Sequence, residues 1–190
     1  MAQAQWSTEP VANAVASTSG TTIASSATET ILFPNMTIPA RELEDNHQLR
    51  IRATGEYSTI GSGTVTLIFS LRWGGVSGTL LCKTGTVTTL ISQTSALWNV
   101  DILLSVRTNG ASGTMMANGV ATVFTGTAPT AGSATGAPAV APMTAGGQTV
   151  PATASVSTIA DTALSLTAKM GASDPGNTVI GHSWTVETVN

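Results

Sequence analysis

A fifteen-residue pattern occurs twice in this chain. Residues 67–81 read LIFSLRWGGVSGTLL, and residues 102–116 read ILLSVRTNGASGTMM, thirty-five positions later. Six of the fifteen aligned positions are identical, and most of the others exchange one apolar residue for another. Each copy is an apolar run ending in arginine, a turn of small residues and a second apolar run, which predicts two β-hairpins. We attribute the repetition to shared turn chemistry, with gene duplication as the alternative.

Apolar residues at every second position recur along much of the chain. The alternation is clearest in residues 48–57, 64–73 and 96–107, and it predicts strands with one face in a core. The first strand is expected at residues 28–38, where two prolines indicate an edge or bulged strand. Further strands are expected at residues 79–83, 84–93, 114–124, 152–159, 164–170 and 178–189. With no convincing helix, the pattern predicts an all-β fold: an antiparallel, jelly-roll-like β-sandwich of about eight strands.

Two stretches lie outside this strand pattern. Residues 1–27 are rich in Ala, Ser and Thr, and we expect an extended N-terminal arm whose Trp6 is either incidental or an anchor on a neighbour. Residues 125–151 are nearly all Ala, Gly, Pro and Thr, which predicts a long surface excursion or a segment ordered by another subunit. The remaining residues of 28–190 are expected to form a single sandwich domain.

The charge of the chain is unusually low. Charged residues make up 9% of the sequence, against about 25% in an ordinary soluble domain. With seven Lys and Arg residues and a net charge of −3, the chain is not expected to bind nucleic acid or an anionic membrane. No apolar run is long enough to cross a bilayer, and the first residues do not resemble a signal peptide. Such a surface suits a protein packed against other subunits, or a secreted one.

No residue pattern points to catalysis, a metal or a cofactor. Cys82 is the only cysteine and follows two leucines, so a buried, inert thiol is expected. His47 and His182 have no further ligands at metal-binding spacing, and polar surface or satisfied core positions are the simpler interpretation. Neither a catalytic triad with its nucleophile elbow nor a phosphate-binding loop can be traced. The chain is therefore expected not to be an enzyme.

Four arginines fall on the non-core faces of expected strands: Arg50, Arg52, Arg72 and Arg107. Ordinary surface charge explains any one of them. Together they suggest an arginine-lined face that pairs with carboxylates of a partner subunit, because the planar guanidinium binds carboxylates with two hydrogen bonds. With Trp6, these arginines are the candidate partner contacts.

Tyr57 and the four tryptophans could in principle stack on sugar rings. Trp73, Trp98 and Trp184, however, all lie on the apolar side of expected strands. Core packing is therefore the favoured interpretation for all three.

A succession of short segments resembles a known class of protein. The segments are FPNMTIPA at 33–40, LRIRATG at 49–55, TLIFSLRWGG at 66–75, GTLL at 78–81 and VRTNGASGT at 106–114. This succession resembles small jelly-roll virion proteins of tailed bacteriophages, which decorate capsids or form head and tail spikes. The resemblance covers roughly residues 30–125.

The resemblance implies a non-enzymatic structural protein of the virion. It would be a capsid decoration (cement) protein on the capsid surface, assembled in the host cytoplasm, that binds the major capsid protein and stabilises the head. Such proteins are trimeric, so a homotrimer is expected, with the arm and the long loop reaching neighbouring subunits. The alternative is a spike or fibre-tip jelly-roll domain that binds host-surface carbohydrate.

Overall fold

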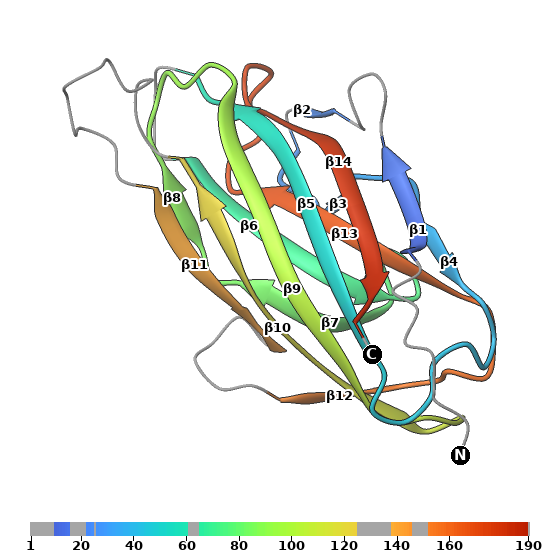
Figure 1. Cartoon of the computed structure of the whole chain (residues 1–190). Coiled ribbons are helices and arrows are strands. Elements are labelled where there is room, and N and C mark those ends of the chain that lie inside the picture. Colours follow the sequence, from blue (N-terminus) through green and yellow to red (C-terminus); the bar gives the residue numbers. More distant parts are fainter. Residues whose placement is uncertain are drawn as a thin grey trace.

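The computed structural model describes residues 10–15, 22–24, 26–60, 65–124, 138–145 and 152–189, and for residues 10–15 it describes the backbone alone. Within these residues, fourteen strands belong to one antiparallel hydrogen-bonded sheet (Figure 1). The strands are β1 (Pro10–Val15), β2 (Ile23–Ala24), β3 (Thr30–Ile31), β4 (Met36–Ile38), β5 (Gln48–Ser58), β6 (Val65–Trp73), β7 (Thr79–Thr84), β8 (Val87–Thr89), β9 (Ala96–Thr108), β10 (Gly113–Val123), β11 (Ala139–Thr144), β12 (Thr153–Val156), β13 (Thr162–Met170) and β14 (Thr178–Thr188).

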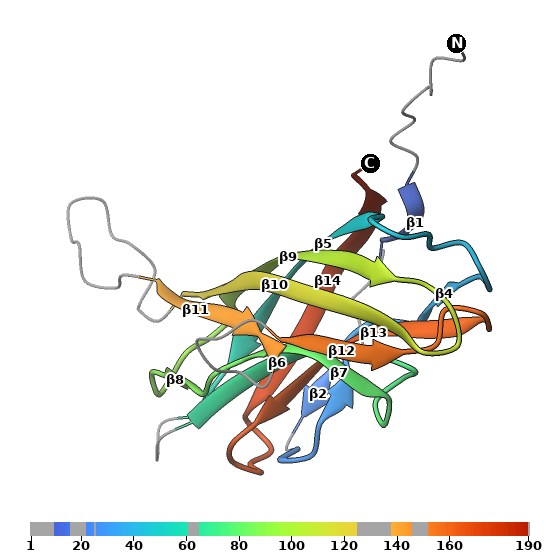
Figure 2. The ribbon, with the colours of Figure 1, turned by 90° about the horizontal axis from the view of Figure 1, so that it is seen from below.

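The sheet folds over on itself into two layers (Figure 2). Its hydrogen-bonded order is β1-β14-β5-β9-β10-β11-β7-β6-β13-β3, with β2, β4, β8 and β12 paired beside this path. Strands β14, β5, β9 and β10 make the first layer, and β7, β6 and β13 make the second. β11 joins the layers, because it pairs with β10 along one edge and with β7 at its end. The result is a nearly closed, barrel-like sheet around one core.

Alternating side chains divide each long strand between core and exterior. In β5, Leu49 and Ile51 are fully buried, whereas Arg50 and Arg52 point outward. β9 buries every second residue from Trp98 to Val106 in the same way. The core side of both strands follows directly from the period of two in the sequence.

Aromatic rings fill the centre of the core. Phe33 stacks on Trp184 with ring centroids 5.6 Å apart, and its edge meets Trp98 at 6.4 Å. Phe69, from the second layer, lies 4.7 Å from Trp98. These contacts bring residues of both layers and of the β3–β4 segment into one apolar cluster.

Part of the outer face of the second layer is covered by another segment of the chain. Ser165 and Thr167 of β13 point away from the core and are nevertheless fully buried, because residues 26–36 lie over them. Ser165 donates a hydrogen bond to the Asn35 side chain at 2.6 Å, and the Leu32 amide donates to the Leu166 carbonyl at 2.9 Å. Among the described residues, no segment lies in this way over the outward side chains of β5 and β9, and Arg52, Asn99 and Leu103 are exposed.

The prediction of an antiparallel all-β fold is confirmed. The described strands outnumber the eight or so expected, because several are pieces of only two or three residues. The expected strand at 28–38, for example, is divided into β3 and β4 by residues 32–35, which include Pro34. Strands also occur in stretches expected to lack them, since β1 and β2 fall within residues 1–27 and β11 falls within residues 125–151.

Candidate functional site

The outer face of the first layer carries a small ion cluster. Arg50 on β5 donates two hydrogen bonds to Asp101 on β9, from Nε at 3.0 Å and from Nη2 at 2.6 Å. Arg52 stands directly opposite Asp101 in the register, and its Nε lies 3.7 Å from the same carboxylate. Arg50 instead reaches Asp101 diagonally, as long side chains on neighbouring strands can. One acid therefore holds two arginines on this face.

The cluster shifts the ionisation of its members toward the charged forms. The hydrogen bond from Arg50 lowers the pKa of the Asp101 carboxyl, and the same bond raises the pKa of Arg50. All three side chains are between 39% and 49% exposed, so solvent screens their attraction and the pairs contribute little to stability. The cluster is better suited to organising a surface than to holding the fold together.

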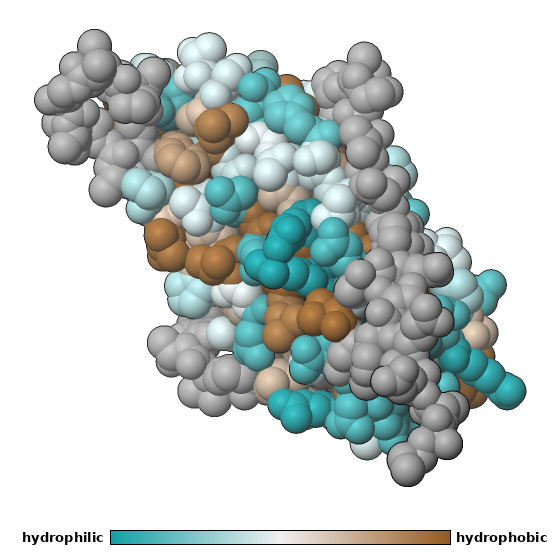
Figure 3. Space-filling view, in the orientation of Figure 1, coloured by the Kyte–Doolittle hydropathy of each residue, from teal (hydrophilic) through white to brown (hydrophobic). Residues whose placement is uncertain are grey.

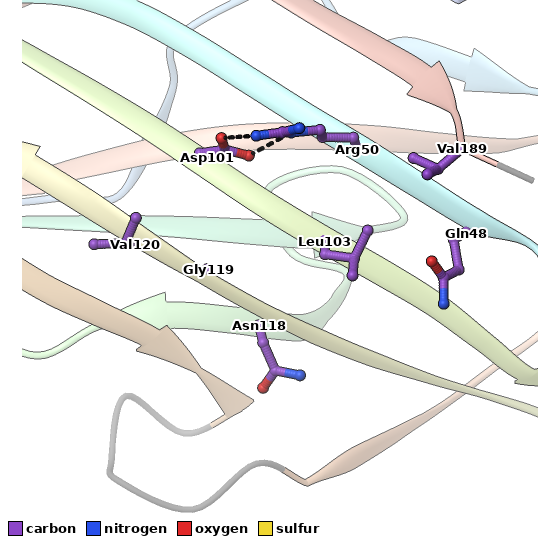
Figure 4. Close-up of a pocket in the computed structure, with 8 residues that line it drawn as sticks. All are labelled: Gln48, Arg50, Asp101, Leu103, Asn118, Gly119, Val120 and Val189. Atoms are coloured by element: carbon purple, nitrogen blue, oxygen red, sulfur yellow. Dashed lines mark hydrogen bonds and ion pairs between the residues drawn. The ribbon is translucent and has the colours of Figure 1, made fainter. Parts of the chain in front are cut away.

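A shallow groove of about 460 Å3 runs beside this cluster. The ion pair forms one wall, and the rest combines apolar side chains of β9, β10 and Val189 with the amide side chains of Gln48 and Asn118 (Figure 4). The groove is lined by Gln48, Arg50, Asp101, Leu103, Asn118, Gly119, Val120 and Val189. It is wide open, and its ionisable groups are already paired with each other. The arrangement offers contact area and hydrogen bonding and no activated nucleophile or acid–base pair.

Apolar side chains are exposed around the groove and at the end of the molecule where β9 begins. Figure 3 shows apolar patches beside a hydrophilic patch in the middle of this face. The exposed large apolar residues in this part of the molecule are Leu90, Ile91, Leu97, Leu103, Phe124, Val140 and Val189. These side chains come from several elements of the sheet and from the loop between β8 and β9.

The four arginines predicted as partner contacts do not share one face. Arg72 on β6 belongs to the second layer, where its Nε and Nη2 bind the Glu29 carboxylate at 2.5 and 2.7 Å. Arg107, near the end of β9, is exposed, and its Nη2 lies 3.7 Å from the sulfur of Met116. Only Arg50 and Arg52 lie together. The fifth candidate, Trp6, is outside the described residues.

Glu29 and Asp101, the acids that pair with these arginines, were not identified from the sequence. Burial raises the pKa of Glu29, but hydrogen bonds from Arg72 and Thr167 outweigh it, so the pKa is lowered overall. Asp101 could have been found from its outward position on a strand next to the arginine-bearing one. Glu29 could not, because it lies 43 positions from Arg72 in a segment without strand periodicity.

The three tryptophans predicted to pack in the core do so. Trp73, Trp98 and Trp184 are at most 5% exposed. The indole of Trp73 donates to the Ser157 carbonyl at 2.9 Å, and that of Trp98 donates to the Glu56 carbonyl at 3.1 Å. None of the three can form a platform for a sugar ring.

The remaining candidates for chemistry are separate from one another. Cys82 is fully buried, as predicted, and burial raises the pKa of its thiol to about 12. His182 lies 3.6 Å from Glu56, and His47 accepts a hydrogen bond from the Glu44 amide at 3.2 Å. Among the described residues, no three His, Cys, Asp or Glu side chains come close enough to bind a metal ion together.

Comparison of the chain with protein-family models, curated proteins and solved structures found no match. No helix within the described residues is long and apolar enough to span a bilayer. A proposal of function therefore rests on the chain's own residues and on their resemblance to jelly-roll virion proteins.

Proposed function

We propose that this chain is a structural virion protein of the capsid-decoration type. It would bind the major capsid protein on the outside of a bacteriophage head and stabilise the shell, as a homotrimer and without catalysing a reaction. The finer fold that we propose is a jelly-roll-like sandwich, with β14, β5, β9 and β10 as one sheet and β7, β6 and β13 as the other. The packing of these two layers around a common core supports that assignment.

The observation that carries the proposal is the open outer face of the first layer. Arg50 and Arg52 on this face are paired with an acid of the same chain, and apolar side chains remain exposed around them. Protein interfaces combine apolar contacts with arginine and are poor in unpaired charge at their centre. The low charge of the whole chain supports the same conclusion, because such a surface is suited to contact with other subunits.

The alternative, a tip domain that binds host carbohydrate, receives less support. A glycan site usually places an aromatic ring against the sugar, and the three tryptophans of the described residues are buried. The groove beside Arg50 has polar groups but is lined by no aromatic side chain. We therefore keep carbohydrate binding as the second hypothesis.

A sedimentation experiment tests the proposal. Shells of the major capsid protein from the virus that encodes this chain would be prepared without it, mixed with the purified chain and pelleted. We expect saturable co-sedimentation, and a higher temperature of shell disruption when the chain is bound. Shells that neither bind the chain nor gain stability from it would refute the proposal.

Two further measurements separate the hypotheses. Mass photometry of the free chain is expected to give a trimer, and a monomer would remove that part of the proposal. A glycan array tests the alternative, because specific binding to a sugar in the absence of shell binding would favour the tip domain.

A further inference from the structure

The loop between β8 and β9 presents two adjacent aliphatic side chains to solvent. Leu90 and Ile91 are 50% and 47% exposed and follow directly after the end of β8. The surrounding run, residues 84–100, contains no charged residue. Neighbouring exposed apolar side chains are candidates for a contact surface, whereas scattered single ones are ordinary.

This loop is fastened to the end of β5 by buried groups. The Thr59 hydroxyl donates to the Leu90 carbonyl at 2.7 Å and accepts from the Gln93 amide at 3.0 Å. The Thr59 amide donates to the Gln93 carbonyl at 2.9 Å, and the Gln93 side chain donates to the Ile91 carbonyl at 3.2 Å. Thr59 and Gln93 are themselves buried. The backbone on both sides of the aliphatic pair is therefore held in place.

Two serines of the same loop adopt a backbone conformation that is unfavourable for residues other than glycine. Ser92 has φ +56° and Ser95 has φ +49°. A backbone hydrogen bond holds each serine in place. The Ser92 amide donates to the Ile60 carbonyl at 3.0 Å, and the Ser95 amide donates to the Ser58 hydroxyl at 3.1 Å. Strained positions of this kind persist where the surrounding structure imposes them, often at binding sites. A loop fixed in advance loses little conformational entropy when it binds.

Two more exposed apolar residues lie at this end of the first layer. Leu97, at the start of β9, is 58% exposed, and Phe124 follows β10 and donates its amide to the Leu97 carbonyl at 2.9 Å. Tyr57, two residues before Thr59, donates its hydroxyl to the Phe124 carbonyl at 2.7 Å. We call Leu90, Ile91, Leu97 and Phe124 the apolar tip.

We propose that the apolar tip inserts into an uncharged, concave apolar pocket of the shell protein. This inference rests on the proposed function and names the part of the chain that makes the contact. A loop that is held in place and exposes two adjacent aliphatic side chains is complementary to an apolar pocket. A protein is favoured over an anionic membrane, because lysines and arginines recruit membranes and the run 84–100 has neither. The sheet neighbour of Leu97, moreover, is the acidic Glu56.

Paired variants test the inference in the full-length chain. Leu90→Asn with Ile91→Asn makes the loop polar, and Leu90→Ala with Ile91→Ala removes apolar area without adding polar groups. The control is Ile159→Asn, which changes a similarly exposed aliphatic residue beyond the other end of β9. Shell binding would be measured by co-sedimentation over a range of concentrations, and folding by thermal unfolding of each free variant.

We expect both double variants to fold and to bind shells at least about tenfold more weakly than the parent chain, with Ile159→Asn unchanged. If the parent chain binds shells and a folded double variant binds as tightly, the inference is overturned and the proposed function stands. If the parent chain binds no shell, both fail. Co-sedimentation with neutral phosphatidylcholine vesicles that is lost in the double variants would overturn the choice of a protein pocket.

Discussion

The two copies of the repeated pattern form hairpins of the same design in different surroundings. Residues 67–81 span the end of β6, its turn and the start of β7, and residues 102–116 span the same parts of β9 and β10. Both hairpins are antiparallel, and both have a register shift close to the turn. The β6–β7 hairpin belongs to the second layer, and the β9–β10 hairpin belongs to the first layer. The two copies therefore compare similar hairpins in the two halves of the molecule.

The turns explain the glycines that the two copies share. Gly75 and Gly110 have φ +79° and +114°, and each accepts a hydrogen bond from the amide of the glycine three residues later. At these later positions, Gly78 and Gly113, a Cβ atom would approach a backbone oxygen to 2.1 Å and 2.7 Å. The two turns share these glycine requirements but differ at one position, because Gly74 has a positive φ of +101° and its counterpart Asn109 is not among the residues with positive φ.

The repeated arginine separates the two copies. Arg72 donates two hydrogen bonds to Glu29 and a third to the Gly78 carbonyl at 2.9 Å, and residues 26–36 cover its surroundings. Arg107 is exposed and contacts only the sulfur of Met116 among the interactions resolved for its side chain. The same residue therefore fastens a segment in one layer and is left available in the other. The first layer, where Arg107 lies, also carries the groove beside Arg50.

The largest effect is expected from alanine at the second glycine of each turn. Gly78→Ala places a methyl group against fixed backbone of Trp73 and Gly74, and should lower the free energy of unfolding by roughly 2–4 kcal/mol. In Gly113→Ala the new methyl group lies further from the nearest backbone oxygen, that of Thr108, than the methyl group of Gly78→Ala lies from that of Trp73. The loss in free energy of unfolding should therefore be about half as large. Urea denaturation of the two variants measures the difference.

Matched controls for this prediction are Gly75→Ala and Gly110→Ala. Nothing lies within 4 Å of a Cβ atom at either position, so only the positive φ opposes alanine. Each should cost about 1–2 kcal/mol, with the larger cost at Gly110, because its φ of +114° lies further from the left-handed region open to alanine than the +79° of Gly75. A Gly78→Ala variant no less stable than Gly75→Ala would contradict the steric argument.

A smaller effect is expected from removing the repeated arginine. Arg72→Met leaves the half-buried Glu29 carboxylate without its main hydrogen-bond donor and should lower the free energy of unfolding by about 1–3 kcal/mol. Arg107→Met removes an exposed charge with one weak contact and should change stability by less than about 0.5 kcal/mol. Denaturant curves at neutral pH test both. Equal losses would show that the covered layer does not depend on the Glu29 contact.

Strands and core positions could be predicted where side chains alternate. Leu49 and Ile51 of β5, and the residues of β9, take the faces that their spacing predicts. β11 could not be predicted, because its Ala, Pro and Val residues show little alternation and its place depends on backbone pairing with β10. Short strands such as β3 and β8 are likewise decided by the strands beside which they lie.

The site was less predictable than the fold. The outward arginines were recognisable from strand periodicity, but their partners depend on which strands are neighbours. Arg50 reaches Asp101 because of the β5–β9 register, and Arg72 reaches Glu29 because residues 26–36 cross the second layer. The loop at Leu90 depends on Thr59, 31 positions away. Contacts of this range follow from the topology and are not encoded in any local pattern.

The smallest effect concerns acid, and it compares Glu29 with Asp101. Hydrogen bonds lower the pKa of both carboxyls in the folded chain, so the unfolded chain binds these protons more tightly. The stabilisation that each provides is complete above the ordinary carboxyl pKa of about 4–4.5 and is lost as pH falls through the lowered pKa of the folded chain. Glu29→Gln should therefore flatten the acid side of the stability curve, measured by urea denaturation between pH 7 and about pH 2.

Asp101→Asn should flatten the curve less, and its effect should disappear in about 1 M salt, because the Asp101 pairs are more exposed than the Glu29 pair. The Glu29 contribution should persist in salt, since its carboxylate is shielded by Thr167 and the covering segment as well as paired with Arg72. The two variants thus distinguish an ion pair that fastens one layer from an ion pair that only arranges a surface. If salt abolished both effects equally, solvent ions would screen the Glu29–Arg72 pair as strongly as the more exposed pairs of Asp101.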